Sequence, residues 1–132
     1  MKPEDKELLR DLCGRLPYGV CCEYEYWDER ECEFYKRVEI VNAITMDGYI
    51  DLDDNYNYEV NDIKPYLFPM SMMDEYQRII YGDLTYAVIN SLPGDIQNNI
   101  NELYKWLNEN HFDYNGLIDK GLAINATGLD IY

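Results

Sequence analysis

The hydrophobic period of the chain changes at the stretch YGVCCEYEY, residues 18–26. Its even positions are apolar or aromatic, whereas Glu23 and Glu25 point to the other side. Alternation with a period of two is typical of a strand that buries one face and exposes the other. This stretch therefore predicts a half-buried β-strand, and the segments on either side are interpreted around it.

Three further segments continue the strand pattern up to residue 60. Residues 33–44 keep one apolar register with Phe34, Val38, Ile40 and Ile44. The pair Asp47-Gly48 is a strong signal for a two-residue hairpin turn, and strands are expected over 49–53 and 56–60. We predict a four-stranded antiparallel meander over residues 18–60, with one apolar face and one solvent-facing side.

Helical patterns flank this predicted sheet. Pro3 and the stripe of Leu8, Leu9 and Leu12 predict a helix over 3–13 that stops at Gly14. Ser71 and Asp74 predict the start of a helix that runs to about Gly82 and resumes over 84–92. Asp95 precedes a third helical stripe of Ile96, Ile100, Leu103 and Leu107, and Asp113 precedes a short helix over 116–120. Regular structure is expected to break at Pro65 and Pro69.

These elements define one α+β domain over residues 1–132. We expect an N-terminal helix, a four-stranded antiparallel meander sheet, and C-terminal helices packed on the apolar face of that sheet. The 132 residues suit a single domain, and the hydrophobic fraction of 47% excludes disorder caused by low hydrophobicity.

The charge of the chain excludes several classes of partner. It has 26 Asp+Glu against 11 Lys+Arg, for a formal net charge of −15. Direct binding of nucleic acid needs clustered cations, and an anionic membrane surface would repel this protein. The first residues are charged, unlike a signal peptide, and we expect a soluble protein in the cytoplasm of a bacterial host.

The cysteines and the acidic loop indicate neither a metal nor another cofactor. Cys13, Cys21, Cys22 and Cys32 contain no C-x-x-C pair, so we expect reduced cysteines that act as small apolar residues. The segment Asp51-x-Asp53-x-Asn55 opens like a calcium loop, but Tyr56 stands where such a loop requires Gly. We therefore expect no metal site and no cofactor.

Three segments carry a resemblance to a known family: LPYGV at 16–20, DIKPYLFPMS at 62–71 and HFDYNGLIDKGLA at 111–123. Together they resemble an uncharacterised family of small proteins from Bacteroides-type gut bacteria and their phages. The resemblance implies a mobile-element setting, in which small proteins often counter host defences, and it brings no established activity. Asn115 stands where the family pattern usually carries Arg.

The sequence favours a binding protein over an enzyme. His111 is the sole histidine, and there is no Gly-x-Ser-x-Gly nucleophile motif. Ser71 and Ser91 are explained by helix capping or termination. We predict no catalytic residue, and a structural component of a virion remains the third alternative.

Our first hypothesis for function is sequestration of a small, adenine-containing signalling nucleotide. Tyrosines can stack on the base, while lysine or arginine holds the phosphates. The predicted ligand-binding residues are Lys64, Tyr66, Arg78, Tyr81, Tyr114 and Lys120. The structural alternative is that Tyr66 and Tyr81 belong to the core and that Lys64 covers apolar surface with its aliphatic part.

The alternative hypothesis is an acidic inhibitor of a host defence protein. Residues of one parity in the predicted strands would share the solvent-facing side of the sheet. They are Glu23, Glu25, Trp27, Tyr35, Glu39, Tyr49, Asp51, Asp53 and Glu59. Such a face could imitate nucleic-acid phosphates and occupy a basic channel, or it could merely keep the protein in solution. Self-association stays open.

Overall fold

The computed structural model of the protein describes residues 1–52 and 56–132. Its long elements are helix α1 (Pro3–Arg15), strands β1 (Cys21–Asp28) and β2 (Glu33–Ile40), and helices α2 (Glu75–Ile89) and α3 (Ile96–Glu109). Its short strands are β3 (Ala43–Ile44), β4 (Ile50–Asp51), β5 (Asn57–Tyr58), β6 (Ile63–Leu67) and β7 (Ile124–Asn125). Single turns of 3-10 helix cover Leu16–Tyr18, Val60–Asp62 and Met70–Met72. The chain is therefore mixed helix and strand, as the α+β class requires.

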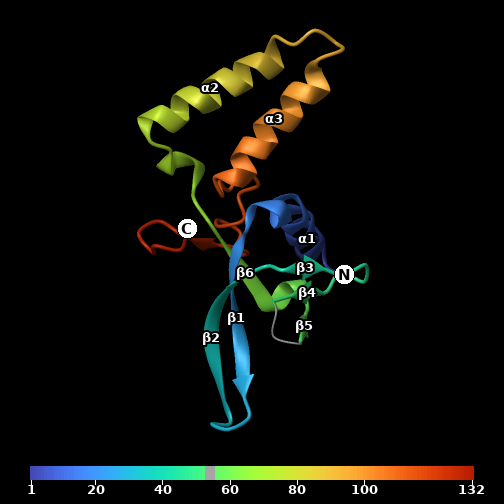
Figure 1. Cartoon of the computed structure of the whole chain (residues 1–132), viewed down its shortest axis with the longest axis vertical. Coiled ribbons are helices and arrows are strands. Elements are labelled where there is room, and N and C mark those ends of the chain that lie inside the picture. Colours follow the sequence, from blue (N-terminus) through green and yellow to red (C-terminus); the bar gives the residue numbers. More distant parts are fainter. Residues whose placement is uncertain (53–55) are drawn as a thin grey trace.

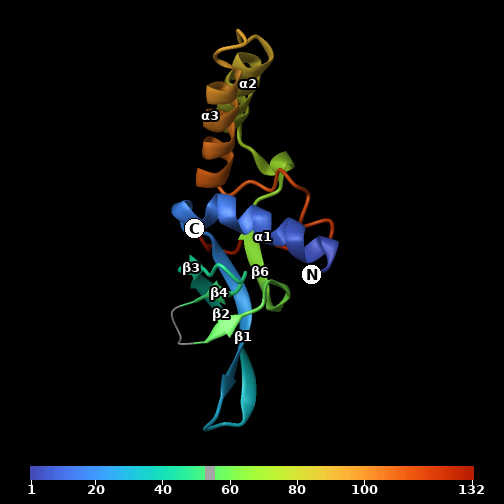
Figure 2. The same cartoon turned by 90° about the vertical axis from the view of Figure 1, so that its right-hand side faces the viewer.

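The molecule is elongated, with a central body and two projections. The α2–α3 pair extends from one end of the body, and the β1–β2 hairpin extends from the opposite end (Figures 1 and 2). Helix α1, strand β6 and the C-terminal segment lie between these projections (Figures 1 and 2).

Helix α1 forms where the sequence predicts it, with Pro3 in its first turn and Leu8 and Leu12 buried. The predicted stop at Gly14 is wrong, because the helix continues to Arg15. The Arg15 guanidinium bonds to the Asp11 carboxylate one turn earlier, at 2.7 Å, and so holds the last turn in the helix. The chain turns instead at Gly19, whose φ of 72° suits glycine.

The predicted four-stranded meander is wrong in its layout. Strands β1 and β2 pair antiparallel as expected, but the strand order of the main sheet is β2-β1-β6-β7, with β6 and β7 parallel. Strands β3, β4 and β5 form a separate antiparallel sheet. Alternation identifies a strand with one apolar face, but it does not specify which strand pairs with it.

Strand β6 was not predicted, because Pro65 lies within it. Pro65 is paired opposite Cys22 of β1, whereas β6 pairs with β7 only at Tyr66 and Leu67. A proline is tolerated in a strand where its missing N–H is not needed by a neighbouring strand. The prolines therefore led to the wrong expectation that regular structure breaks here, where β6 connects β1 to the C-terminal segment.

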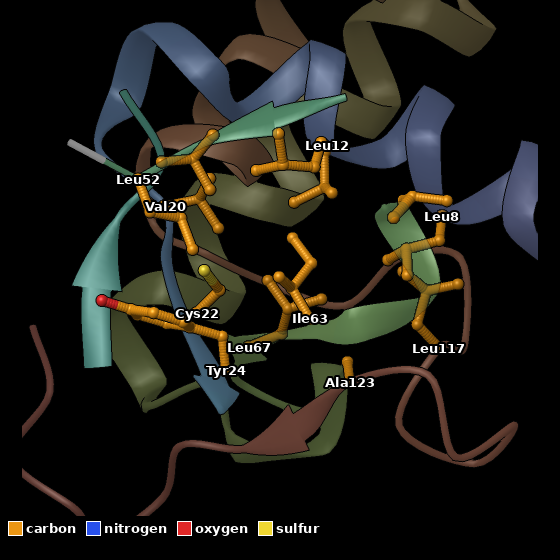
Figure 3. Packing of buried hydrophobic residues seen from close by; sticks show 13 residues of the cluster. Leu8, Leu12, Val20, Cys22, Tyr24, Leu52, Ile63, Leu67, Leu117 and Ala123 are labelled. Carbon is orange, nitrogen blue, oxygen red and sulfur yellow. The ribbon is translucent and has the colours of Figure 1, made fainter. Parts of the chain in front are cut away.

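The main core lies between α1, strands β1 and β6, and the C-terminal segment. Figure 3 shows Leu8 and Leu12 of α1 facing the same interior as Val20, Ile63 and Leu117. The adjacent thiols of Cys21 and Cys22 belong to different apolar clusters, as expected for neighbours in a strand. Burial raises the pKa of Cys22 to about 12, so its thiol stays protonated.

The two long C-terminal helices pack on each other rather than on the sheet, which corrects the predicted layer arrangement. Tyr81 of α2 stacks on Trp106 of α3, and the Asn99 side chain donates to the Ser91 hydroxyl at 2.7 Å. Among the residues that the structure describes, the base of the pair meets the body at the cluster of Met73, Leu107 and Phe112. Helix α2 thus contacts α3 through the side that includes Tyr81, while Ile79, Tyr86 and Ile89 of α2 stay exposed.

Two aspartates hold the start of a C-terminal segment: Asp74 precedes α2, and Asp113 precedes residues 116–120. Asp74, rather than Ser71, caps α2: its carboxylate accepts the Gln77 N–H at 2.7 Å, and the Gln77 side chain accepts the Asp74 N–H at 3.0 Å. The predicted helix over 116–120 is wrong, because that segment forms successive turns. Asp113 nevertheless accepts the N–H groups of Leu117 and Ile118 at 2.8 and 2.9 Å.

We predict that Asp74→Ala lowers the free energy of unfolding by about 1 kcal/mol, because it removes both bonds of the capping box. Urea unfolding followed by circular dichroism measures the loss. Asp83→Ala, an exposed position within the same helix, is the matched control and should change stability by less than about 0.5 kcal/mol. Equal losses in the two variants would show that the box does not stabilise α2.

Candidate functional site

The structure does not bring the six predicted nucleotide-binding residues together. Lys64 lines a cavity of about 650 Å³ beside the β1–β2 hairpin, and the other five residues lie outside it. Tyr66 is buried, and its hydroxyl donates to Glu23 Oε2 at 3.1 Å. Burial and the neighbouring Glu23 carboxylate raise the pKa of Tyr66 to about 12. Tyr66 is therefore a core residue, as the structural alternative expected.

The remaining members lie on separate elements. Arg78 is exposed on α2, and Lys120 bonds the Glu7 carboxylate of α1. Tyr81 and Tyr114 contact the same apolar cluster at the base of the helical pair. The Tyr114 hydroxyl donates to Asn108 Oδ1 at 2.8 Å, and burial raises the pKa of that hydroxyl. The two tyrosines are thus engaged in packing.

The predicted acidic face is divided by the register of the hairpin. Each odd-numbered residue of β1 pairs with an even-numbered residue of β2, as in Glu23↔Val38 and Glu25↔Lys36. Directly opposed residues share a face of a sheet. Glu23, Glu25 and Trp27 therefore lie on one face, while Tyr35 and Glu39 lie on the other, so the expectation of a single face is wrong. Odd and even residue numbers identify the two faces within one strand. The length of the turn decides which residue numbers of the next strand lie on the same face.

The other members of that face belong elsewhere. Asp51 lies in β4 of the second sheet, and Tyr49 and Glu59 lie beside β4 and β5. Asp53 lies outside the described residues. The acidic residues that remain together are those of the β1–β2 hairpin.

This hairpin, residues 23–39, is hereafter called the arm. Strand β1 pairs with β6 only as far as Tyr24, so beyond this point β1 and β2 extend from the body (Figures 1 and 2). All eight residues of β2 are exposed. The arm therefore holds its shape through contacts between its own two strands.

Aromatic and charged side chains stiffen the arm. The rings of Trp27 and Phe34 lie 4.8 Å apart between centroids, and the Arg37 guanidinium lies 3.7 Å from the centre of the Tyr26 ring. Pairs of these kinds contribute about 0.5–1.5 kcal/mol each. At the tip, Asp28 Oδ1 accepts the Arg30 N–H at 2.8 Å and so fixes the turn. The arm is therefore an ordered projection.

The arm is also strongly acidic. Its acidic residues are Glu23, Glu25, Asp28, Glu29, Glu31, Glu33 and Glu39, and its basic residues are Arg30, Lys36 and Arg37. Seven carboxylates against three cations give this short segment a negative field. A surface that combines such a field with exposed aromatic rings is suited to contact with a basic protein surface.

Sequence reasoning missed part of this surface. Phe34, Val38 and Ile40 were expected to face the core, but their exposed fractions are 64%, 44% and 56%. The apolar register alone does not show whether another layer covers it. The sequence did contain one indication that β2 is exposed on both faces. Four of its eight residues are charged: Glu33, Lys36, Arg37 and Glu39.

His111 has a structural environment. Its φ is 59°, and its ring stacks on Tyr132 with centroids 3.5 Å apart. Its backbone carbonyl accepts the Phe68 N–H at 2.8 Å. Burial, with a smaller effect of the Arg15 charge, lowers the pKa of His111 to about 4, so the ring is neutral at pH 7. His111 therefore connects the end of α3 to the C-terminus.

No family model, no curated protein and no solved structure matches the chain. Within residues 1–52 and 56–132, no three His, Cys, Asp or Glu side chains converge as a metal site would require. The same described residues contain no helix with the length and apolarity needed to cross a membrane.

We predict that His111 makes stability depend on pH below neutrality. Its pKa is about 4 in the folded chain and about 6.5 when unfolded, so the unfolded state takes up the proton first as the pH falls. The stabilisation by neutral His111 is present above pH 6.5 and is lost towards pH 4. The variant His111→Asn tolerates the positive φ and does not titrate. Between pH 6.5 and pH 4, its free energy of unfolding should fall by on the order of 1 kcal/mol less than that of the wild type. Urea unfolding at several pH values measures this, and parallel profiles for the two proteins would contradict the assignment.

Proposed function

We propose that the protein is a non-catalytic binder that engages a basic surface of a partner protein through its arm. The observation that supports this most is the exposure of all of β2 on a hairpin that projects from the body with an aromatic pair, Trp27 and Phe34. Exposed apolar side chains that lie next to one another, as these two rings do, are more typical of an interaction site than scattered single ones. In protein interfaces, by contrast, Trp, Tyr and Arg carry most of the binding energy.

Charge supplies the second part of the argument. The net charge of −15 and the carboxylates of the arm would speed the encounter with a positively charged partner. Glu25, Glu29, Glu31 and Glu33 carry exposed carboxylates along the arm, whereas the Glu23 carboxylate accepts the Tyr66 hydroxyl. Such a row, flanked by aromatic rings, resembles the phosphates and bases that a basic nucleic-acid channel accepts.

The resemblance to phage-associated proteins supports a particular class of partner. In a mobile-element setting, the basic channel would belong to a host defence protein that acts on nucleic acid. The arm would occupy that channel and exclude the nucleic acid. This mode of inhibition needs no catalytic residue and no cofactor.

A second candidate is sequestration of a small signalling nucleotide in the 650 Å³ cavity beside the arm. One observation favours it: Lys36 and Lys64 line this cavity together with the aromatic residues Phe34, Tyr24 and Tyr58. The carboxylates of Glu23, Glu25 and Asp62 also line it, however, and they outnumber the two cations. A phosphate would meet net repulsion there, and we therefore place the arm first.

The arm proposal predicts that Trp27→Ala with Phe34→Ala weakens partner binding at least tenfold, because it removes the aromatic pair. The tagged chain would capture its partner from a lysate of a Bacteroides-type bacterium, and the purified pair would be measured by biolayer interferometry. Met46→Ala removes an apolar side chain exposed on the body and should leave binding unchanged. A single-stranded oligonucleotide should compete with the arm for the partner.

Two outcomes would contradict this proposal. One is equal binding of the partner by the wild type and the arm variant. The other is a nucleotide, from a panel of cyclic dinucleotides and ADP-ribose, that raises the melting temperature in a way that depends on Lys36 and Lys64. A ligand at 100 times its dissociation constant adds about 2.7 kcal/mol, so a thermal-shift assay would detect it.

A further inference from the structure

The outer face of α2 carries large apolar side chains that belong to none of the apolar clusters formed by the described residues. The exposed fractions are 72% for Tyr76, 58% for Ile79, 68% for Tyr86 and 75% for Ile89. The opposite side of α2 packs on α3 through Tyr81, so the helix is apolar on both sides. A surface helix in a two-helix layer normally exposes a polar face. The outer face therefore differs from an ordinary solvated surface.

The spacing on this face is that of a helix–helix contact. Residues 79, 82, 86 and 89 follow one another at intervals of three, four and three, which places them in one line along a helix. Ile79, Tyr86 and Ile89 are the large members of the line, and Gly82 is the small one. The line runs along α2 on the side away from α3.

Gly82 has no explanation within the single chain. A Cβ added there would meet no atom within 4 Å, so close packing inside the molecule does not require glycine. Glycine in a helix interior costs about 1 kcal/mol relative to alanine. A glycine between Ile79 and Tyr86 leaves a hollow in the apolar line, which a large side chain from another helix can fill.

We propose that a second copy of this chain covers this face, with the two α2 helices antiparallel about a two-fold axis. The line is self-complementary in this arrangement. Tyr86 of each copy then lies over Gly82 of the other, and Ile79 of each copy meets Ile89 of the other. Along the helix, residues 82 and 86 are equally far from Leu84, and so are residues 79 and 89. A single two-fold axis at the level of Leu84 therefore produces both contacts. A symmetric dimer requires such self-complementarity, whereas a different partner does not.

The charge distribution favours the same occupant. Residues 76–94 contain one cation, Arg78, and one anion, Asp83, in a chain whose net charge is −15. Two copies of so acidic a protein repel each other over much of their surfaces, and this segment, which has no net charge, adds little to the repulsion. The acidic arm lies at the far end of the molecule (Figure 1), so the dimer keeps the two arms away from the contact.

The available area is sufficient for a stable dimer. Tyr76, Ile79, Tyr86 and Ile89, with Leu92 and Ile96 at the end of the pair, are 44–75% exposed. Together they expose on the order of 700 Å² in each copy, so a symmetric contact that covered all of them would bury up to about 1,400 Å², within the range of specific interfaces. The dimer does not depend on the function proposed for the arm, although it would give two arms to one particle.

Light scattering of the full-length protein after gel filtration tests the dimer. The chain mass is 15.7 kDa, and we expect the wild type to have twice this mass at micromolar concentrations. Tyr86→Glu and Gly82→Gln should each yield monomers with unchanged helical circular dichroism, because one places a charge in the contact and the other fills the hollow. Asn98→Glu, an exposed position on α3, is the control and should remain dimeric. A monomeric wild type, or dimers in all variants, would overturn the proposal.

Cross-linking tests the orientation and does not rely on disrupting the fold. In a background with Cys13→Ser and Cys32→Ser, Ile79→Cys with Ile89→Cys should give a covalent dimer on mild oxidation. The two positions are about 15 Å apart along one helix, too far for a bond within one chain. Ile79→Cys alone should remain uncross-linked, because the antiparallel arrangement separates the two copies of residue 79. A parallel pair would cross-link Ile79→Cys alone as well as the double variant, so a covalent dimer of the single variant would contradict the proposed axis.

Discussion

The ion pair between Arg15 and Asp11 is the interaction on which the rest of the structure depends. Both side chains are fully buried, and Arg15 Nε lies 2.7 Å from Asp11 Oδ2. A second nitrogen of Arg15 donates to the Phe112 carbonyl at 2.7 Å, and the guanidinium lies 4.8 Å from the centre of the Tyr114 ring. Two buried charges are costly to remove from water, so their position is tightly specified once they pair. The pair thereby fixes α1 against the segment that follows α3.

That segment connects the two projections to the body. Phe68, just after β6, donates to the His111 carbonyl and accepts the Asp113 N–H, each at 2.8 Å. Through β6 this junction supports β1 and hence the arm, and through Phe112 it supports the base of the helical pair. Asn115, whose side chain lies beside the ion pair, donates to Asp11 Oδ1 at 2.9 Å. In this chain the position therefore contributes to the buried network.

The sequence predicted the helices and strands more accurately than the contacts between them. The apolar stripes of α1 and α3 and the alternation of β1 reflect local periodicity, which a sequence displays directly. The β1–β2 register, the pairing of Pro65 opposite Cys22 and the docking of α2 on α3 depend on contacts between distant residues, and periodicity does not encode them. For the candidate site, the acidic and aromatic composition of residues 23–39 was visible beforehand. The exposure of Phe34 and Val38 was not, because an apolar register is the same whether or not a second layer covers it.

A double-mutant cycle on the buried pair tests this account most directly. The free energy of unfolding would be measured for Asp11→Asn, Arg15→Met and the double variant in the full-length chain. Each single change leaves one buried group without its partner and should cost about 3–5 kcal/mol, while the double variant should cost at least about 2 kcal/mol less than the sum. Additive losses, with a coupling energy below about 0.5 kcal/mol, would contradict the central place given to this ion pair.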